Sequence, residues 1–285
     1  MSRTNFTPIV SVIIPTYNRS HLLGEAISSV LAQDFRYFEL IVVDDGSTDD
    51  TQHLLKSYQN IQVVRQDHYG VSAARNAGIA RASGQLLAFL DSDDLWLPKK
   101  LSTQVAFFKQ HPNALICQTE EIWMKNGRRV NPKKRHKKHS GMIFEACLEL
   151  CLVSPSAVMI ERTLLDQVGC FDEKLPACED YELWLRIGCR FPIYLISDPL
   201  VIKRAGNHDQ LSTLPGLDRY RIYALKKLIE SEMLSKRQRI AAIEALRKKC
   251  AIYATGCLKR GRVDEANRYI QMAAKFREEE NEHKT

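Results

Sequence analysis

The chain has 285 residues, of which 45% are hydrophobic and 26% are charged, and its formal net charge is +7. These values are typical of a soluble globular protein with a full core. The positive charge is local, because residues 122–139 contain eight Lys or Arg and no acid, which leaves −1 for the rest of the chain.

The lengths of the apolar runs and the spacing of the cysteines disfavour a membrane-spanning or secreted protein and a zinc-binding protein. No run approaches the roughly 18 apolar residues of a membrane span, and the N-terminus has no long apolar signal segment. The eight cysteines form no CxxC pair and have no finger-like spacing with histidine, which disfavours zinc and favours reduced thiols. We therefore expect a cytoplasmic protein that contacts a membrane, if at all, peripherally at its inner face.

Short β-branched runs alternate with helical patterns in the first 110 residues. Strands are expected at 9–14, 38–43, 61–64 and 86–90, and helices near 20–32, 49–58, 71–82 and 98–110. This alternation predicts an α/β fold class, with βαβ units around a mostly parallel central sheet flanked by helices.

The pattern becomes irregular after residue 110 and purely helical after residue 215. A strand is expected at 113–124, a basic loop or hairpin at 125–139, an apolar helix at 141–152, a strand with a short helix at 156–173, and a helix near 179–189. The last helices are expected at 216–234, 236–257 and 262–279. The final two resemble one tetratricopeptide-type pair, but such repeats need stacked neighbours, so we favour a packing role over partner binding. We divide the chain into residues 1–215 and an all-helical C-terminal extension, residues 216–285.

Polar segments follow three of the predicted strands. They are "PTYNR" at 15–19, "DDGSTDDT" at 44–51 and "DSDD" at 91–94. In open α/β sheets ligands bind beyond the carboxyl ends of the strands, so these segments belong at one rim. Helix capping and turn formation explain Gly46 to Asp50 but leave Asp44 and Asp45 as unneeded acids.

The acidic segment at 91–94 predicts a metal site. Like charges this close repel one another unless a cation or hydrogen-bond donors compensate. In extended geometry Asp91 and Asp93 point the same way, with the small Ser92 between them. Two carboxylates on one side suit Mg²⁺ or Mn²⁺, which completes its shell with waters and phosphates; a solvated turn is the alternative. GxGxxG and GxxxxGK[ST] are missing, which disfavours dinucleotide-binding and P-loop proteins.

Four segments in this order resemble the blocks of family 2 glycosyltransferases of GT-A fold. They are "VSVIIPTYNR", "IVVDDGSTDDT", "GVSAARNAGIARASGQLLAFLDSDD" and "CEDYELWLRI", and the match runs from about Val10 to Leu211. The resemblance implies a Rossmann-like sheet with a nucleotide-sugar half at about 9–110 and an acceptor half at about 111–215. It also implies metal-dependent, inverting transfer. The QxxRW block and the membrane spans of polymerising members are missing, which favours transfer of a single sugar.

The resemblance also assigns roles to residues on the donor side. The nucleotide-binding residues would be Pro15, Thr16, Tyr17, Asn18, Asp45, Arg75, Asp91 and Ser92. Within this set Asp45 would accept a hydrogen bond from a uracil-like base edge, and Arg75 would lie near the diphosphate. The metal, Mn²⁺ or Mg²⁺, would be held by Asp93, with His208 as a further ligand; a lone histidine in a polar loop is otherwise a surface residue.

On the acceptor side the resemblance points to the block around residue 180. Asp180 would be the catalytic base that takes the proton of the acceptor hydroxyl. Glu179 would lie on the acceptor side. Without the resemblance, both acids would be ordinary first-turn helix acids. Trp184, four residues beyond Asp180 on the same helix face, is expected either to wall the acceptor site or to lie in the core.

The basic stretch at 125–139 has three interpretations. It is a solvated hairpin, a nucleic-acid-binding loop, or a surface attracted to an anionic membrane or a phosphate-bearing acceptor. We favour the third and disfavour nucleic acid, because the run has no interleaved aromatic residues.

The predicted function is transfer of one sugar from a nucleotide sugar, a UDP-sugar, to a glycan or lipid-linked acceptor in cell-surface polysaccharide biosynthesis. One alternative is a sugar-nucleotide-forming nucleotidyltransferase, which is expected to have a Gly-rich phosphate loop after the first strand. The other is a non-enzymatic basic binding module whose acids only cap helices and turns.

Overall fold

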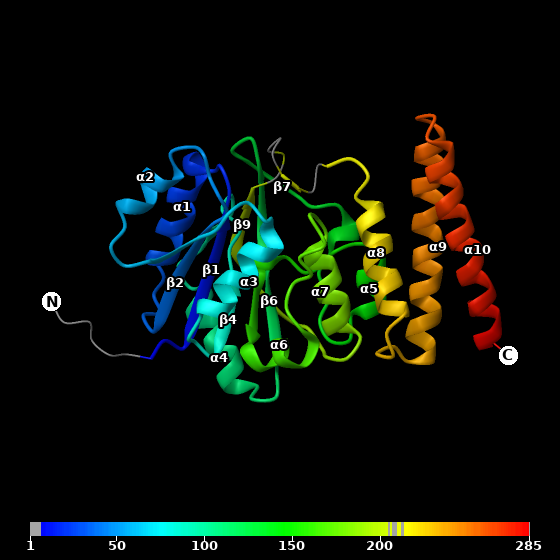
Figure 1. Ribbon diagram of the computed structural model, residues 1–285. Coiled ribbons are helices and arrows are strands. Elements are labelled where there is room, and N and C mark those ends of the chain that lie inside the picture. Colours follow the sequence, from blue (N-terminus) through cyan, green and yellow to red (C-terminus); the bar gives the residue numbers. More distant parts are fainter. Residues whose placement is uncertain (1–6, 205, 207–209, 212–213, 285) are drawn as a thin grey trace.

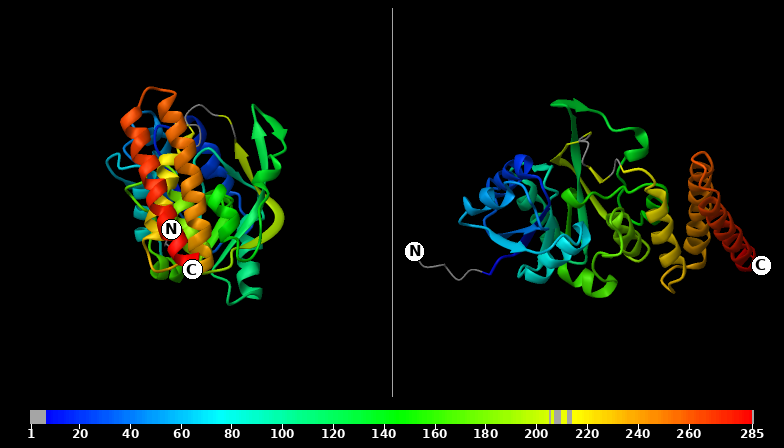
Figure 2. Two further views of the ribbon diagram at one scale, coloured as in Figure 1. Left: turned by 90° about the vertical axis from the view of Figure 1, so that its right-hand side faces the viewer. Right: turned by 45° about the horizontal axis from the view of Figure 1, so that its top comes forward.

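The structure, a computed structural model, describes residues 7–204, 206, 210–211 and 214–284. A mixed sheet lies in the first two-thirds of the chain, and helices flank it (Figure 1). The helices that end the chain stand side by side at the end of the molecule remote from the N-terminus (Figures 1 and 2). The predicted α/β fold class with C-terminal helices is confirmed.

The N-terminal half of the sheet is parallel, as predicted. Its strands are β1 (Val10–Thr16), β2 (Phe38–Asp44), β3 (Gln62–Arg65) and β4 (Leu86–Phe89), joined by helices α1 (Ser20–Leu31), α2 (Thr51–Lys56) and α3 (Val71–Arg81). All seven residues of β1 and all four of β4 are buried, as expected for strands covered on both faces. Because these strands run the same way, the segments that follow them meet at one edge of the sheet.

Beyond β4 the sheet is mixed, because β8 pairs with β4 and β6 in antiparallel fashion. The elements here are β5 (Leu95–Trp96), α4 (Lys100–Gln110), β6 (Ile116–Lys125), β7 (Arg128–Val130), α5 (Phe144–Glu149), β8 (Val158–Glu161), α6 (Arg162–Val168), α7 (Glu179–Gly188) and β9 (Tyr194–Arg204), with 3₁₀ turns at Lys134–His136 and Pro155–Ala157. Within the described residues the strand order is β3-β2-β1-β4-β8-β6-β9-β5, with β7 paired to β6. Asn126 and Gly127, both with positive φ, form the tight turn of the β6–β7 hairpin.

The C-terminal helices are α8 (Asp218–Ile229), α9 (Lys236–Leu258) and α10 (Val263–Lys284). A capping box formed by Ser235 and Gln238 begins α9. Helix α8 packs against α7, α9 packs against α5 and α8, and α10 packs against α9. One buried cluster contains Phe89 of the sheet, Trp184 of α7 and Leu246 of α9, so the helical extension shares its core with the sheet. No helix in the described part of the chain has the length and apolarity needed to cross a membrane.

Candidate active site

A cavity of about 1020 Å³ lies where β1, β2 and β4 end. Its walls come from the segments after these strands, the start of α3, strand β6, the segments around residues 136–138 and 150–155, the start of α7 and the first turn of α8. The residues predicted for the donor side all line it: Pro15, Thr16, Tyr17, Asn18, Asp45, Arg75, Asp91, Ser92 and Asp93. Glu179 and Asp180 line it as well, so chain segments far apart in sequence meet at one site.

A buried arginine joins the two halves of this site. The side chain of Arg75, on α3, is 3% exposed and donates from Nη2 to Asp91 Oδ1 at 2.7 Å and from Nη1 to Glu179 Oε1 at 2.5 Å. Burial acts to lower the pKa of Arg75, but its two carboxylate partners outweigh burial and raise it. Burial raises the pKa of Glu179 to about 7, and the charge of Asp180 adds to this while Arg75 opposes it. The ion pairs link the end of β4 to the start of α7.

The three acids after β4 have different surroundings. Asp91 is held by Arg75, whereas Asp93 Oδ2 accepts from Arg19 Nη1 at 2.9 Å and Gln210 Nε2 at 3.0 Å. Asp94 is buried and accepts from Ser156 Oγ at 2.7 Å and from the Arg204 amide at 3.0 Å. Burial, reinforced by Asp93 and Asp91, raises the pKa of Asp94 to about 8 against the charge of Lys203. Asp94 therefore supports the local fold.

The donor chemistry at this position fits a divalent cation. Asp91 and Asp93 present hard carboxylate oxygens to the cavity, and the guanidinium of Arg19 on Asp93 shows that this carboxylate accepts a cationic partner. In the described part of the chain no group of three or more His, Cys, Asp or Glu side chains is arranged around a metal position. Waters and substrate phosphates would thus complete the coordination shell. His208 lies outside the described residues.

Asp45 organises the loop after β3. Its Oδ1 accepts from Gln66 Nε2 at 2.6 Å and the Tyr69 amide at 3.0 Å, and its Oδ2 contacts His68 Nδ1 at 2.8 Å and the Gly70 amide at 2.9 Å. These four contacts match the acceptor capacity of a carboxylate. A base-edge N–H would have to replace one of them.

His68 is a site residue that the sequence argument missed. Its ring stacks on that of Tyr17, with centroids 3.8 Å apart and an interplanar angle of 17°. The pair presents a flat aromatic surface beside Asp45 in the cavity wall. The rule that pointed to the segments after the other strands also applies to "QDHYG", residues 66–70 after β3, and would have found His68.

Asp180 lies in the first turn of α7, directly after Cys178, whose φ is 63°, and Glu179. Its Oδ1 accepts from the Tyr181 amide at 2.7 Å and its Oδ2 accepts from Cys151 Sγ at 3.4 Å. Burial, with the charge of Asp180, raises the pKa of the Cys151 thiol, so that it remains a donor. Glu179 is engaged by Arg75, whereas Asp180 makes no ion pair with Lys or Arg in the described residues. Of the two acids, Asp180 is the one available to accept a proton.

The prediction that Trp184 walls the acceptor site is wrong. The side chain is 1% exposed, packs edge to face on Phe171 with centroids 6.4 Å apart, and does not line the cavity. Helix α7 packs between the rest of the core and α8, so nearly every side of it is buried and the position four residues after Asp180 faces inward.

The basic stretch forms part of the cavity wall. Trp123, His136 and Lys138 line the cavity, and Lys138 is anchored by Glu121 Oε1 at 3.1 Å and by the Thr119 carbonyl at 2.9 Å. Lys203 of β9 also lines the cavity and donates to Ser154 Oγ at 3.1 Å. The remaining basic residues of the stretch are exposed: Lys125, Arg128, Arg129, Lys133, Lys134, Arg135 and Lys137.

The helical extension also contributes to the cavity. Leu217, which precedes α8, and Arg221, in its first turn, line the cavity. The sequence analysis assigned this region to packing, since Arg221 carries no motif and looks like any charged residue of a helix.

A model described as "Glycosyl transferase family 2" matches residues 11–169. The chain belongs to this family. It is 32% identical over 246 residues to "Uncharacterized glycosyltransferase RT0329" of Rickettsia typhi, covering 82% of this chain and 77% of the relative. It is 34% identical over 185 residues to the Escherichia coli "UDP-Glc:alpha-D-GlcNAc-diphosphoundecaprenol beta-1,3-glucosyltransferase WfgD", covering 63% of this chain and 69% of that one.

A solved structure supports the fold of this family 2 glycosyltransferase. The crystal structure of S. aureus TarS 1-349 in complex with UDP-GlcNAc superposes with a TM-score of 0.68 at 20% identity, covering 93% of this chain and 91% of that one. The predicted family and enzyme class are confirmed. The alternatives, a nucleotidyltransferase and a non-enzymatic binding module, are therefore set aside.

The buried Glu121–Lys138 pair anchors this part of the cavity wall, and we expect it to stabilise the fold. Burial opposes ionisation, but Lys138 and Lys203 outweigh it and lower the pKa of Glu121 to about 2. A depressed carboxyl pKa contributes stability that is present above about pH 4.5 and is lost as the pH falls toward 2. Glu121→Gln leaves buried cations unpaired and should lower the free energy of unfolding at pH 7 by about 3 kcal/mol.

Chemical denaturation at pH 7, 4.5 and 3 measures this effect, with Glu145→Gln, which removes an exposed pair with Arg237, as control. The difference between wild type and Glu121→Gln should shrink as the pH falls, while Glu145→Gln stays within about 0.5 kcal/mol of wild type. A difference that is constant across this range would contradict the assigned role of Glu121.

Proposed function

We propose that this family 2 glycosyltransferase moves a single sugar from a UDP-sugar to a hydroxyl of a glycan or lipid-linked acceptor in cell-surface polysaccharide biosynthesis, with inversion. The observation that carries the proposal is that Asp91, Asp93 and Asp180 face one cavity, in which Arg75 links Asp91 to Glu179, the neighbour of Asp180. The relative WfgD is named for a UDP-Glc donor and a diphosphoundecaprenol-linked acceptor, and TarS was crystallised with UDP-GlcNAc.

The donor would lie along the ends of β1, β2 and β4. The base is placed on the Tyr17–His68 surface, next to Pro15 and Thr16. Asn18, whose φ is 50°, fixes this rim because its Oδ1 accepts from the Thr48 amide at 2.7 Å.

The ribose and diphosphate would extend from the base toward the acids after β4. Ser92 and Asp91 would contact the ribose side, with Arg75 near the diphosphate. Asp93 would hold the divalent cation, Mn²⁺ or Mg²⁺, with His208 as a further candidate ligand. When bound, this cation neutralises charge on the departing nucleoside diphosphate.

The chemistry is a single displacement. Asp180 accepts the proton of the acceptor hydroxyl while the hydroxyl oxygen forms a bond to the anomeric carbon of the sugar. The bond from that carbon to the diphosphate oxygen breaks, and its electron pair leaves with the nucleoside diphosphate. Glu179 supports this step by holding the start of α7 against Arg75.

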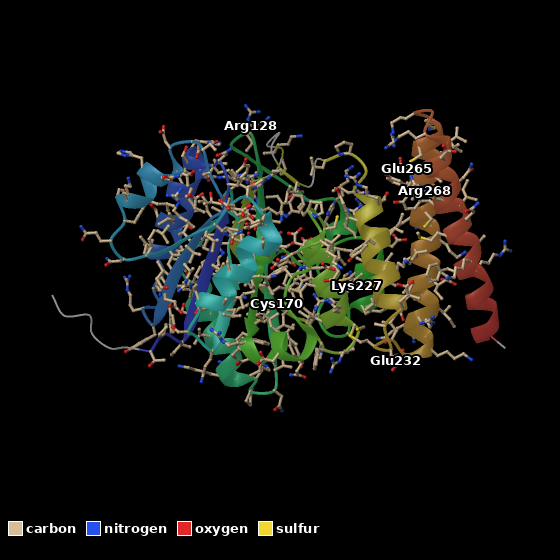
Figure 3. The ribbon with its side chains drawn as sticks, in the orientation of Figure 1. Arg128, Cys170, Lys227, Glu232, Glu265 and Arg268 are labelled. Atoms are coloured by element: carbon tan, nitrogen blue, oxygen red, sulfur yellow. The ribbon has the colours of Figure 1, made fainter. Side chains whose placement is uncertain are left out.

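The exposed basic residues of the stretch at 125–139 fit an anionic membrane surface. None of the seven exposed Lys and Arg side chains between residues 125 and 137 forms an ion pair with a carboxylate in the described part of the chain. Figure 2 shows the β6–β7 hairpin projecting from the sheet. Arg128 points outward at the rim of the molecule (Figure 3). Because the base of the hairpin lines the cavity, contact there would bring a lipid-linked acceptor to the site.

Metal-dependent nucleotide binding tests the donor site. Calorimetry should show that Mn²⁺ strengthens UDP binding by the wild type and that EDTA reverses this gain. Asp93→Ala should bind UDP at least about tenfold more weakly in the presence of Mn²⁺, because the ion loses its carboxylate. Asp34→Ala, at an exposed acid, is the control and should match the wild type. Unchanged Mn²⁺ dependence in Asp93→Ala would place the metal elsewhere.

Asp180→Asn tests the base separately from the donor site. The amide keeps the shape of the side chain but cannot take a proton, so transfer should fall by about 100-fold or more. Calorimetry should find UDP affinity within about twofold of wild type, since little binding energy changes. Transfer at the wild-type rate in this variant would refute the role of Asp180.

Vesicle sedimentation tests the basic stretch at 125–139. Wild type should bind vesicles of phosphatidylglycerol and phosphatidylcholine but not phosphatidylcholine alone, and less at high salt. Changing Lys133, Lys134, Arg135 and Lys137 to Gln should weaken binding at least about 100-fold, since each basic residue near the surface contributes roughly 1 kcal/mol. The same loss of charge at Lys236, Arg237, Lys259 and Arg260 is the matched control. Equal weakening by both sets of substitutions would show that the basic stretch is not the part of the protein that contacts the membrane.

A further inference from the structure

The first turn of α8 brings a basic side chain into the cavity from outside the four sequence blocks of the family. Arg221 is 22% exposed, and its Nη1 donates to Asp218 Oδ1 at 3.0 Å. Its Nε is buried and has no hydrogen-bond partner. A buried donor without an acceptor is costly, so a ligand acceptor at this position would be stabilising.

A second cation, Lys249, lies close to this guanidinium. Lys249 of α9 is buried and donates to the Glu149 carbonyl at 2.9 Å, a neutral partner. Burial lowers the pKa of Lys249, and the nearby charge of Arg221 lowers it further. Asp218 is the carboxylate that directly contacts Arg221, so an anion entering from the cavity would offset the repulsion between the two cations.

The position of Arg221 places it beside the base and away from the donor. The Sγ of Cys178, which precedes α7, contacts the Leu217 carbonyl at 3.9 Å, so the start of α7 abuts the start of α8. The proposed donor side is reached from Asp180 in the other direction, through Glu179 and Arg75. A group at Arg221 would therefore belong to the acceptor.

We propose that Arg221 is an acceptor-binding residue and that it binds a phosphate group on the acceptor. This inference rests on the proposed function, because it assumes that the acceptor hydroxyl lies at Asp180. A planar guanidinium suits phosphate, which it can contact through two parallel hydrogen bonds. The half-exposed side chains of Leu211 and Leu214, which also line the cavity, offer apolar contact to the remainder of a lipid-linked acceptor.

The test measures binding of inorganic phosphate to enzyme already saturated with UDP and Mn²⁺, so that the donor site is filled. Arg221→Ala should weaken phosphate binding by about tenfold or more. Arg221→Lys should weaken it less, because lysine keeps the positive charge but cannot donate the two parallel hydrogen bonds of a guanidinium. Arg219→Ala is the matched control, since Arg219 is on the same helix, contacts Tyr220 and does not line the cavity. Thermal unfolding of each variant verifies folding, and Arg221→Lys carries the test if Arg221→Ala does not fold.

Each outcome separates this inference from the proposed function. Equal phosphate affinity in wild type and the folded Arg221 variants, or equal weakening by Arg219→Ala, would overturn the acceptor subsite while UDP binding stands. Weakened UDP binding in Arg221→Ala would also overturn it, by assigning the arginine to the donor. Failure of wild type to bind UDP would contradict the proposed function itself, and the phosphate titration without UDP would then test Arg221 alone.

Discussion

The buried guanidinium of Arg75 is the constraint on which the site depends. Taking a cation out of water is costly unless ion pairs and hydrogen bonds compensate, and Arg75 obtains both from Asp91 and Glu179. Since these partners lie after β4 and at the start of α7, the pairing fixes the end of β4 relative to the start of α7. Truncating either partner would remove one of the two ion pairs that compensate the buried guanidinium.

The neighbouring acids differ in which of them are engaged by other side chains. Asp91 and Glu179 are engaged by Arg75, and Asp94 is engaged by Ser156 and the Arg204 backbone. Asp93 faces the cavity and pairs with the guanidinium of Arg19. Asp180 accepts hydrogen bonds from the backbone amide of Tyr181 and the thiol of Cys151. Acids that look alike in the sequence thus become suited to metal binding, to support and to proton transfer because of what each one contacts.

The sequence predicted which segments meet at the cavity, because a simple rule of parallel sheets applies to β1, β2 and β4. The segments after β1, β2 and β4 meet at one edge, and the family blocks identify them. The four contacts of Asp45 were not predictable, and the sequence could not decide between the cavity wall and the core for Trp184, because hydrogen-bond partners and helix orientation are set by tertiary packing. Arg221 was missed for a related reason: it belongs to a helix whose pattern indicates only burial on one face, and the cavity reaches it through the fold.

The acceptor side that we propose lies around Asp180, where β6, the basic stretch and the start of α8 line the cavity. The central claim is a single displacement at the anomeric carbon of the sugar, with Asp180 as the base. Asp180 takes this role because its neighbour Glu179 is held by Arg75. The most direct test is nuclear magnetic resonance of the glycosidic product formed from an α-linked UDP-sugar. The account predicts a β-linked product, by inversion at the anomeric carbon. An α-linked product would contradict it.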